Sequence, residues 1–372
     1  MDVLRWLGVG SVAALLAVWA GYPLVMRVIA AARGTPPMPP MHGRPTVTAV
    51  IASRDEPDAI AARVANLLET TYPADRLDVV VAVDYAAPAT AGDLSLGGPV
   101  RTVGGDAPGG KAAGLNAGVR AATGDILVFS DTFQRFDTDT IGELVSAFGD
   151  PRVGAVSGAL HLPAGGSGLL GAYWSMERRL RRDEARLHSV IGVTGAVYAM
   201  RRSLWEPLPD GLILDDVYGP MRLVLAGHRI AFAETARATD HRVTTADQEY
   251  RRKVRTLAGN LQLCAWLPGV LDPRANPVWI QFLLHKLARL LTPYWLALIA
   301  IWILAELVRL APARVLGAGI LTIAAASVWI LHGRDGFARR LRSLVVWMAS
   351  LQAAVVRGTY LGIRGRWDVW QR

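Results

Sequence analysis

The chain has 372 residues, and its 52% hydrophobic content with a mean hydropathy of +0.28 is too apolar for a purely soluble protein. Its net charge of +9 comes almost entirely from arginine, because Lys111, Lys253 and Lys286 are the only lysines. The single cysteine, Cys264, excludes an internal disulfide, and no histidines accompany it at zinc-ligand spacing.

An apolar stretch opens the chain. Residues Val3 to Ala32 are interrupted only by Arg5 and Arg27, exceed the length of a signal-peptide core, and precede no small-residue cleavage site. We therefore expect residues 1–33 to form one transmembrane anchor, followed by a Pro/Gly-rich linker over residues 34–44.

Strand and helix patterns alternate from residue 45 onwards. Runs rich in β-branched residues predict strands, and helical patterns fall between them. In chain order, the predicted segments are strand 47–51, helix 60–69, strand 78–83, helix 111–122, strand 126–129, helix 140–148 and strand 153–158. This alternation predicts an α/β domain over residues 45–265, with a mostly parallel sheet and helices on both faces.

The composition becomes apolar again after Asn276. We expect interfacial helices over residues 266–289, with Lys286 on their polar side, and then about three transmembrane helices over residues 290–363. The predicted spans are 290–310, 315–331 and 344–363, followed by a basic tail over residues 364–372. Arg357 interrupts the last span, so that segment either crosses the bilayer or lies in its interface.

Basic residues gather beside the apolar runs. They are Arg27, Arg33 and Arg44 near the first run, and Arg334, Arg339, Arg340 and Arg342 near the last. A lipid bilayer therefore explains the positive charge better than nucleic acid, which needs an exposed basic and aromatic patch in the soluble part. The positive-inside rule places the α/β domain in the cytosol. We expect a multi-pass protein of the bacterial inner membrane.

Two aspartates follow predicted strands. Asp84 comes after the run 79–83, and Asp131 comes just beyond the run 126–129. Open α/β sheets bind ligands at the carboxyl ends of their strands, so nucleotide binding is the expected use of these acids. Taken alone, an aspartate after a strand more often caps a turn.

Residues 105–112, Gly-Asp-Ala-Pro-Gly-Gly-Lys-Ala, nearly match a phosphate-binding P-loop. The last position of that motif is a Ser or Thr whose hydroxyl meets Mg²⁺, and here it is Ala112. An ATPase or GTPase is therefore a weak interpretation, and a plain loop is another. The longer segment from Lys111 to Asp131 fits a different pattern better.

That segment resembles the part of family 2 glycosyltransferases that lines the nucleotide pocket. Other motifs follow in the order found in membrane-bound members of that family, such as cellulose, hyaluronan and poly-N-acetylglucosamine synthases. They are Arg54–Glu56, Gly195–Arg202, Leu214–Asp216 and Gln248–Arg252. The resemblance implies a GT-A fold, a Rossmann-like cytosolic domain beside transmembrane helices. It also implies inverting transfer from a nucleotide sugar, with a UDP-sugar favoured.

By this resemblance, Asp84, Lys111, Asn116 and Asp131 bind the donor, with Asp84 at the nucleoside. Asp131 corresponds to the first acid of the Asp-x-Asp motif, which holds Mg²⁺ or Mn²⁺ at the diphosphate. The second acid of that motif is replaced by Phe133. Metal binding is therefore expected to weaken or to shift onto diphosphate oxygens, water and a remote side chain.

Asp216 matches the final acid of the family's Thr-Glu-Asp motif, here Leu214-Asp215-Asp216. The resemblance implies that it is the base which takes the proton from the acceptor hydroxyl. The alternative is that Asp215 and Asp216 cap a helix over residues 217–226, where acids are favourable. Both interpretations can hold, because adjacent acids can divide the roles.

Gln248 and Arg251 match a Gln-x-x-Arg motif that contacts diphosphate and acceptor in the family. The residues assigned to that region by resemblance are Thr194, Gly195, Asp215, Gln248, Arg251 and Arg252. Taken alone, the run 251–255 is typical of a helix face in contact with solvent or lipid headgroups. Processive synthases close the motif with tryptophan where this chain has Arg252, so processivity stays open.

Three further acids receive structural interpretations. Asp139 is expected to cap the helix at residue 140. Glu177 and Glu184 lie in an arginine-rich helical stretch, and a salt-bridged surface is expected for both, with acceptor contact as the alternative.

Two hypotheses follow. The first is an inverting glycosyltransferase that acts on a glycan or lipid acceptor in envelope polysaccharide or glycolipid synthesis, with an export or accessory subunit as a further partner. The second is a catalytically silent, nucleotide-binding membrane scaffold or partner subunit, motivated by Phe133 and Arg252. The presence of Asp216, Gln248 and Arg251 favours the enzyme.

Overall fold

The computed structural model describes residues 2–34, 43–87, 96–161, 168–242, 245–310 and 336–367, together with Pro39, Met41, Leu94, Gly319, Trp329 and His332. The chain forms two compact units. The helical unit comprises residues 1–24, 244–261 and 283–372, and the sheet unit comprises residues 25–243 and 262–282.

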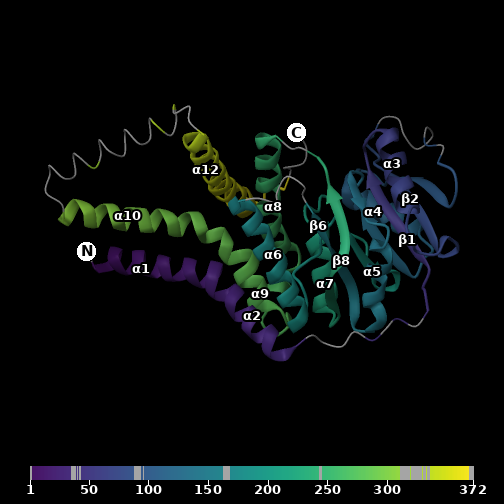
Figure 1. Ribbon diagram of the computed structural model, residues 1–372, viewed down its shortest axis with the longest axis horizontal. Helices are drawn as coiled ribbons and strands as arrows, with labels where there is room; N and C mark the ends of the chain where they lie inside the picture. The colour runs from purple at the N-terminus through teal and green to yellow at the C-terminus, as the bar shows by residue number, and fades with distance from the viewer. Residues whose placement is uncertain are drawn as a thin grey trace. The chain divides into compact units, whose positions relative to one another are not determined.

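Within the described residues, the sheet unit contains an eight-stranded sheet in the order β3-β2-β1-β4-β7-β6-β8-β5 (Figure 1). The strands are β1 (Val47–Ser53), β2 (Leu77–Val83), β3 (Val100–Gly104), β4 (Ile126–Ser130), β5 (Gln134–Phe136), β6 (Val153–His161), β7 (Tyr198–Arg201) and β8 (Arg229–Asp240). The helices of this unit are α3 (Pro57–Leu68), α4 (Lys111–Ala121), α5 (Thr140–Ser146), α6 (Gly168–Leu187), α7 (Asp215–Leu225) and α9 (Trp279–Phe282). Short 3₁₀ turns cover Ala74–Arg76, Ala147–Gly149, Arg202–Leu204 and Pro268–Leu271.

The pairing confirms the predicted mostly parallel sheet. Strands β3, β2, β1 and β4 run parallel, and β6 runs parallel to β8. Strand β7 is antiparallel to both β4 and β6, and β5 is antiparallel to β8, which the sequence did not predict. Strands β1, β2 and β4 therefore end at the same edge of the sheet, where their carboxyl ends present loops to a ligand.

Strand β1 is buried on both faces, as expected for a central strand of a parallel sheet. Ala49 and Ile51 pack in one core with Ile60 of α3. On the other face, a Cβ added to Gly118 of α4 would lie 2.7 Å from Cγ1 of Val50. Glycine thus lets α4 lie directly on the strands, which fixes the first residue of that helix near the carboxyl edge.

The helical unit contains most of the long apolar helices. They are α1 (Asp2–Leu16), α10 (Thr292–Leu310) and α12 (Gly336–Ile363). Helix α2 (Tyr22–Arg33), which follows α1 through a π turn (Ala17–Gly21), belongs mostly to the sheet unit. A π turn (Leu283–Leu287) and a 3₁₀ turn (Ala288–Leu291) precede α10, and most of α8 (Ala246–Trp266) also belongs to this unit. Among the described residues, three helical stretches are long and apolar enough to cross a membrane: Val3–Arg33, Trp279–Leu310 and Gly336–Ile363. The span predicted at 315–331 lies outside the described residues, apart from Gly319 and Trp329.

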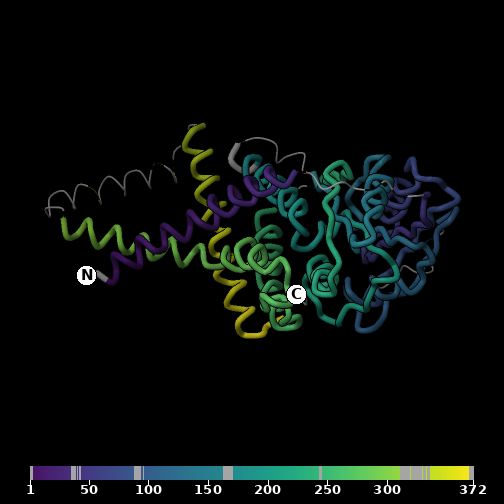
Figure 2. The backbone as a smooth tube through the Cα atoms, turned by 90° about the horizontal axis from the view of Figure 1, so that it is seen from below, coloured from purple at the N-terminus to yellow at the C-terminus, as the bar shows by residue number. Residues whose placement is uncertain are grey.

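Small residues allow close packing between these helices. A Cβ at Gly8 would lie 2.4 Å from Cδ2 of Trp302, so α1 and α10 touch at that glycine, and Figure 2 shows the two helices side by side. The indole of Trp19 donates a hydrogen bond of 3.1 Å to the hydroxyl of Thr292. Further along, Gly358 of α12 lies against α8, because its added Cβ would be 2.8 Å from Cβ of Leu257.

Several sequence expectations differ from the structure. Asp139 is the N-cap residue of α5, as expected, but its side chain makes no capping hydrogen bond. The helix expected to continue to residue 148 gives way to a 3₁₀ turn after Ser146. The hydrophobic pattern does not indicate β5 and β8 as strands, because both contain many polar residues. These strands are stabilised by pairing with each other.

Gly358→Leu is expected to lower the stability of the protein by roughly 1–3 kcal/mol, because the new side chain would be forced against α8. A Cβ at this position already lies 2.9 Å from the carbonyl oxygen of Val254. The measurement is the thermal unfolding midpoint of the full chain in detergent. Gly336→Leu is the control, since a Cβ there meets nothing within 4 Å. Equal midpoints for the two variants would contradict this packing.

Candidate active site

A lysine ammonium joins two carboxylates at the carboxyl edge of the parallel strands. Asp131 follows β4 directly, and Lys111 is the first residue of α4. The Nζ atom of Lys111 lies 2.8 Å from Oδ1 of Asp131 and 3.5 Å from Oδ2 of Asp215, the first residue of α7. The side chains of Lys111 and Asp131 are 27% and 37% exposed, whereas Asp215 is buried. The Lys111–Asp131 pair is therefore accessible to a ligand.

The surrounding acids keep Lys111 charged. Burial acts to lower its pKa, but the charges of Asp131 and Asp215, the hydrogen bond to Asp131 and the charge of Asp216 together raise the pKa of Lys111 well above its ordinary value. Burial and the same carboxylates raise the pKa of Tyr198 well above 10. The site therefore contains a permanent ammonium and a neutral phenol at physiological pH.

A fully buried arginine lies close to Asp131. Nε of Arg63, in α3, donates a hydrogen bond of 2.8 Å to the hydroxyl of Ser130, and the guanidinium lies 4.1 Å from the ring centroid of Phe136. Burial and the charge of Arg135 lower the pKa of Arg63 to about 9, and the charge of Asp131 opposes this shift. Arg63 thus adds positive charge next to the single acid that follows β4.

Asp84 binds the glycine-rich loop that precedes α4. Its Oδ1 accepts hydrogen bonds from the backbone N–H groups of Ala86, at 3.0 Å, and Gly110, at 3.1 Å. Gly109 and Gly110 have φ angles of +94° and +92°, a backbone region that favours glycine. A Cβ at Gly109 would also lie 2.7 Å from Oδ1 of Asp84. The near P-loop sequence therefore folds around a carboxylate of the protein.

Asp216 lies against a glycine turn. The N–H of Val193 donates a hydrogen bond of 2.7 Å to the carbonyl of Asp216, and a Cβ at Gly195 would lie 3.1 Å from Cβ of Asp216. Helix α7 begins at Asp215, so both acids lie in its first turn, and the residue at the N-cap is Leu214. The expected helix start at residue 217 is therefore too late. Acids in the first turn interact favourably with the helix dipole.

Arg181 of α6 organises the Thr194 turn, which the sequence interpretation missed. Its guanidinium donates hydrogen bonds of 2.7 Å to the hydroxyl of Thr194 and 2.9 Å to that of Ser157. Burial lowers the pKa of Arg181, while the charges of Glu177, Glu184 and Asp216 act to raise it. Glu177 lies four residues before Arg181 and Glu184 three residues after it, a spacing that places these three residues on one helix face. That spacing was the signal in the sequence from which the role of Arg181 could have been inferred.

Glu184 is fully buried, so the surface position expected for it is wrong. Glu177 is half-buried. Because both acids attract Arg181, their carboxylates belong to the charge network behind Asp216 rather than to a solvated helix face.

Asn116 serves a different neighbour from the one predicted. Its amide nitrogen donates a hydrogen bond of 2.8 Å to the carbonyl of Leu208, and its Oδ1 accepts one of 2.9 Å from the N–H of Leu208. The amide is thus occupied at both ends by the loop before α7. This geometry shows that Asn116 positions the loop at Leu208, and direct contact with the donor stays a prediction.

Gln248, Arg251 and Arg252 belong to the helical unit, on the first turns of α8. Oε1 of Gln248 accepts a hydrogen bond of 2.9 Å from the N–H of Thr245 and so closes the start of the helix. Arg251 pairs with Asp247 at 2.9 Å, and Arg252 pairs with Glu249 at 2.7 Å. Exposed pairs of this kind contribute about 0–1 kcal/mol, so both guanidinium groups are easily released.

The residues around Asp131 fit a divalent cation poorly. Phe133 is 38% exposed where the motif would have its second acid, and the guanidinium of Arg242 lies 5.0 Å from its ring centroid. Asp240, the acid that pairs with Arg242, accepts hydrogen bonds from Arg242 and Gln134. In the described part of the chain, no group of three His, Cys, Asp or Glu residues is placed to hold a metal ion. Asp131 and Asp215 are the acids that converge here, and the ammonium of Lys111 already lies between them.

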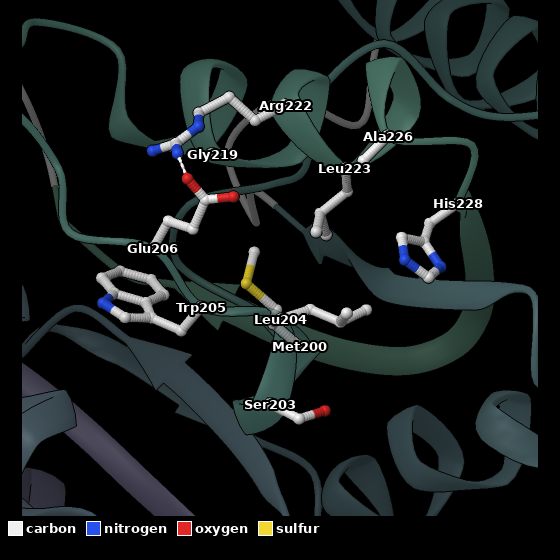
Figure 3. Close-up of a pocket in the computed structure, with 10 residues that line it drawn as sticks. All are labelled: Met200, Ser203, Leu204, Trp205, Glu206, Gly219, Arg222, Leu223, Ala226 and His228. Atoms are coloured by element: carbon white, nitrogen blue, oxygen red, sulfur yellow. Dashed lines mark ion pairs between the residues drawn. The ribbon is translucent and has the colours of Figure 1, made fainter.

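A separate hollow of about 130 Å³ lies elsewhere in the sheet unit (Figure 3). It is lined by Met200, Ser203, Leu204, Trp205, Glu206, Gly219, Arg222, Leu223, Ala226 and His228, and Glu206 and Arg222 form an ion pair across it. Met200 pairs with Leu127 in the register between β7 and β4, whereas Tyr198 pairs with Phe129, next to the acid end. The hollow therefore opens towards the amino end of β4, away from Asp131.

Comparison with known proteins identifies a sequence family. The family described as "Glycosyltransferase like family 2" matches residues 45–259. The probable glycosyltransferase YdaM of Bacillus subtilis (strain 168) is 24% identical over 237 residues, which cover 59% of this chain. The chain spans 56% of the length of that relative.

A solved structure shares the fold. Mannosyltransferase PcManGT from Pyrobaculum calidifontis, in complex with GDP-Man and Mn²⁺, matches with a TM-score of 0.70 at 22% identity. The match covers 98% of this chain and 99% of that chain. The likeness confirms the predicted GT-A fold.

Arg181→Met is expected to lower the stability of the protein by about 2–4 kcal/mol, because it leaves two hydroxyls and three acids without their shared cation. The measurement is the thermal unfolding midpoint in detergent. Arg179→Met is the matched control, since Arg179 lies on the same helix and is exposed. An Arg181→Met protein as stable as the control would show that the network contributes little to folding.

Proposed function

Because the chain belongs to the glycosyltransferase-like family 2, we propose that it transfers a sugar, with inversion, from a nucleotide-diphosphate sugar to a glycan or lipid acceptor at a membrane. The observation that carries the proposal is the convergence of Lys111, Asp131 and Asp215 at the carboxyl edge of the sheet, with Asp216 in the same turn of α7. Three separate segments deliver these side chains to one place, as a donor site requires.

In the proposed reaction, the acceptor oxygen attacks the anomeric carbon from the face opposite the leaving group. The bond between that carbon and the diphosphate oxygen breaks, and its electron pair leaves with the diphosphate. Asp216 accepts the proton that the acceptor hydroxyl loses. Lys111 stabilises the negative charge that develops on the departing diphosphate.

Asp84 and the loop before α4 are proposed to form the nucleoside end of the donor site. Two backbone N–H groups already hold the carboxylate of Asp84 in place, which supports a preorganised position. Asn116 is proposed to support this site indirectly, through the loop at Leu208. Either a UDP-sugar, favoured by the family resemblance, or a GDP-sugar, as bound by PcManGT, is a candidate donor.

Thr194 and Gly195, in the turn that packs against Asp216, are proposed to contact the acceptor. Gln248, Arg251 and Arg252, on α8 of the helical unit, are proposed from the family resemblance alone to contact diphosphate and acceptor. Arginine suits a diphosphate because its planar fork donates two parallel hydrogen bonds. The divalent cation expected at Asp131 stays a prediction: if bound, it would neutralise diphosphate charge, but the carboxylates of Asp131 and Asp215 are already paired with Lys111.

A bacterial inner membrane is the proposed location, with the sheet unit in the cytosol. Three apolar helical stretches among the described residues support a multi-pass protein. Arg339, Arg340 and Arg342, near the start of α12, support a cytosolic position for that end of the helix. This topology would bring a lipid acceptor or a growing glycan to the same membrane face as the donor.

Asp216→Asn is expected to abolish transfer, by at least about a hundredfold, because an amide cannot take the acceptor proton. Donor binding should persist, since the substitution keeps the size of the side chain. The measurement is release of nucleoside diphosphate in the presence of acceptor, beside nucleotide binding. Asp210→Asn is the control, an acid-to-amide change at an exposed position of the loop before α7. Substantial transfer by Asp216→Asn would refute the assigned role.

A donor panel should identify one nucleotide sugar that the wild-type protein consumes. Detergent-purified protein is supplied with UDP- and GDP-sugars, and with mixed bacterial lipids and oligosaccharides as acceptors. We expect release of nucleoside diphosphate from a single donor, because hydrogen-bonded pockets discriminate strongly between sugars. Binding of nucleotide with no turnover across the panel would favour the silent scaffold instead.

A further inference from the structure

Cationic side chains already occupy the surroundings of Asp131, the acid that the metal motif would use. Lys111 lies 2.8 Å from this carboxylate, and the charge of Asp131 also attracts Arg63 and Arg242. Other acids balance these cations, since Asp215 and Asp216 act on Lys111 and Asp240 and Asp55 act on Arg242. A divalent metal at Asp131 would have to compete with the ammonium of Lys111 for this carboxylate, whereas a diphosphate would be attracted to the cations themselves.

Two of the three cations can reach a ligand. The side chain of Arg242 is 44% exposed and that of Lys111 is 27% exposed. Arg63 is fully buried and can act only through its field. Lys111 and Arg242 are therefore the groups available to contact phosphate oxygens.

Arg242 is held in position by a carboxylate and by an aromatic ring. Its Nε and Nη2 atoms donate hydrogen bonds of 3.0 Å and 2.7 Å to Asp240, and Asp240 in turn accepts one of 2.7 Å from the amide of Gln134. Its guanidinium lies 5.0 Å from the ring centroid of Phe133. An acid in place of Phe133 would offer the guanidinium a further carboxylate, whereas the aromatic ring offers it only a π face.

We propose that this chain binds the donor diphosphate through Lys111 and Arg242, with no resident divalent metal. The inference rests on the proposed function, since it assigns the groups that hold the donor. In this arrangement Phe133, which occupies the sequence position of the second acid of the Asp-x-Asp motif, packs against the guanidinium of Arg242. The ammonium between Asp131 and Asp215 supplies positive charge to the departing diphosphate.

The test measures binding of GDP and UDP to the full-length protein in detergent by calorimetry, with EDTA and with Mn²⁺. We expect the dissociation constant of the preferred nucleotide to differ by less than about threefold between the two conditions. Loss of binding in EDTA by about tenfold or more, with recovery in Mn²⁺, would overturn the inference and leave the proposed function standing. Absence of binding in both conditions would overturn the donor site itself, and the inference with it.

Arg242→Gln should weaken binding about tenfold in both conditions, because a charge-assisted contact to phosphate is lost. Arg152→Gln is the matched control: Arg152 makes the same pair of hydrogen bonds to Asp150, two residues earlier, at the amino end of β6. Equal effects of the two substitutions would overturn the role of Arg242. Phe133→Asp should weaken nucleotide binding in EDTA, and Mn²⁺ should restore the binding of this variant. A response of the wild-type protein to Mn²⁺ as large as that of Phe133→Asp would also contradict the proposal.

Discussion

Lys111 holds together carboxylates that the chain delivers from two separate elements. Asp131 arrives at the end of β4 and Asp215 at the start of α7. Carboxylates that share a site repel each other, and the ammonium between them offsets this repulsion. A donor diphosphate would enter a site whose charges are already oriented, and such preorganised charge costs no rearrangement during reaction.

Close backbone approaches decide where the acids stand. Gly118 allows α4 to lie on β1, and this contact determines where Lys111 begins the helix. Gly195 allows the Thr194 turn to touch Asp216, and Arg181 holds the same turn through two hydroxyls. Any side chain at either glycine would push a charged group away from its partners. The catalytic geometry thus depends on residues that carry no chemistry themselves.

The sequence predicts β1, β2 and β4 of the parallel half of the sheet, because strands such as β1 and β2 are continuous apolar runs buried on both faces. It misses β3 of the same half, a partly exposed strand at the edge of the sheet. It does not predict β5 or β7, since three- and four-residue strands are determined by pairing with distant neighbours. Order along the chain places Asp84 and Asp131 at one sheet edge. It cannot show that the amide of Asn116 is bound to Leu208, because that contact joins residues 92 positions apart.

Exposure separates the arginines that hold the site from those that can meet a ligand. Arg63 is fully buried, and Arg181 is tied to the hydroxyls of Thr194 and Ser157, so neither can leave its place without leaving buried polar groups unpaired. The side chain of Arg251 is 71% exposed and pairs with Asp247, a neighbour on its own helix. Exchanging an exposed carboxylate partner for a diphosphate costs about 1 kcal/mol or less. Buried arginines therefore hold the site together, whereas exposed arginines are free to exchange their partner for a ligand.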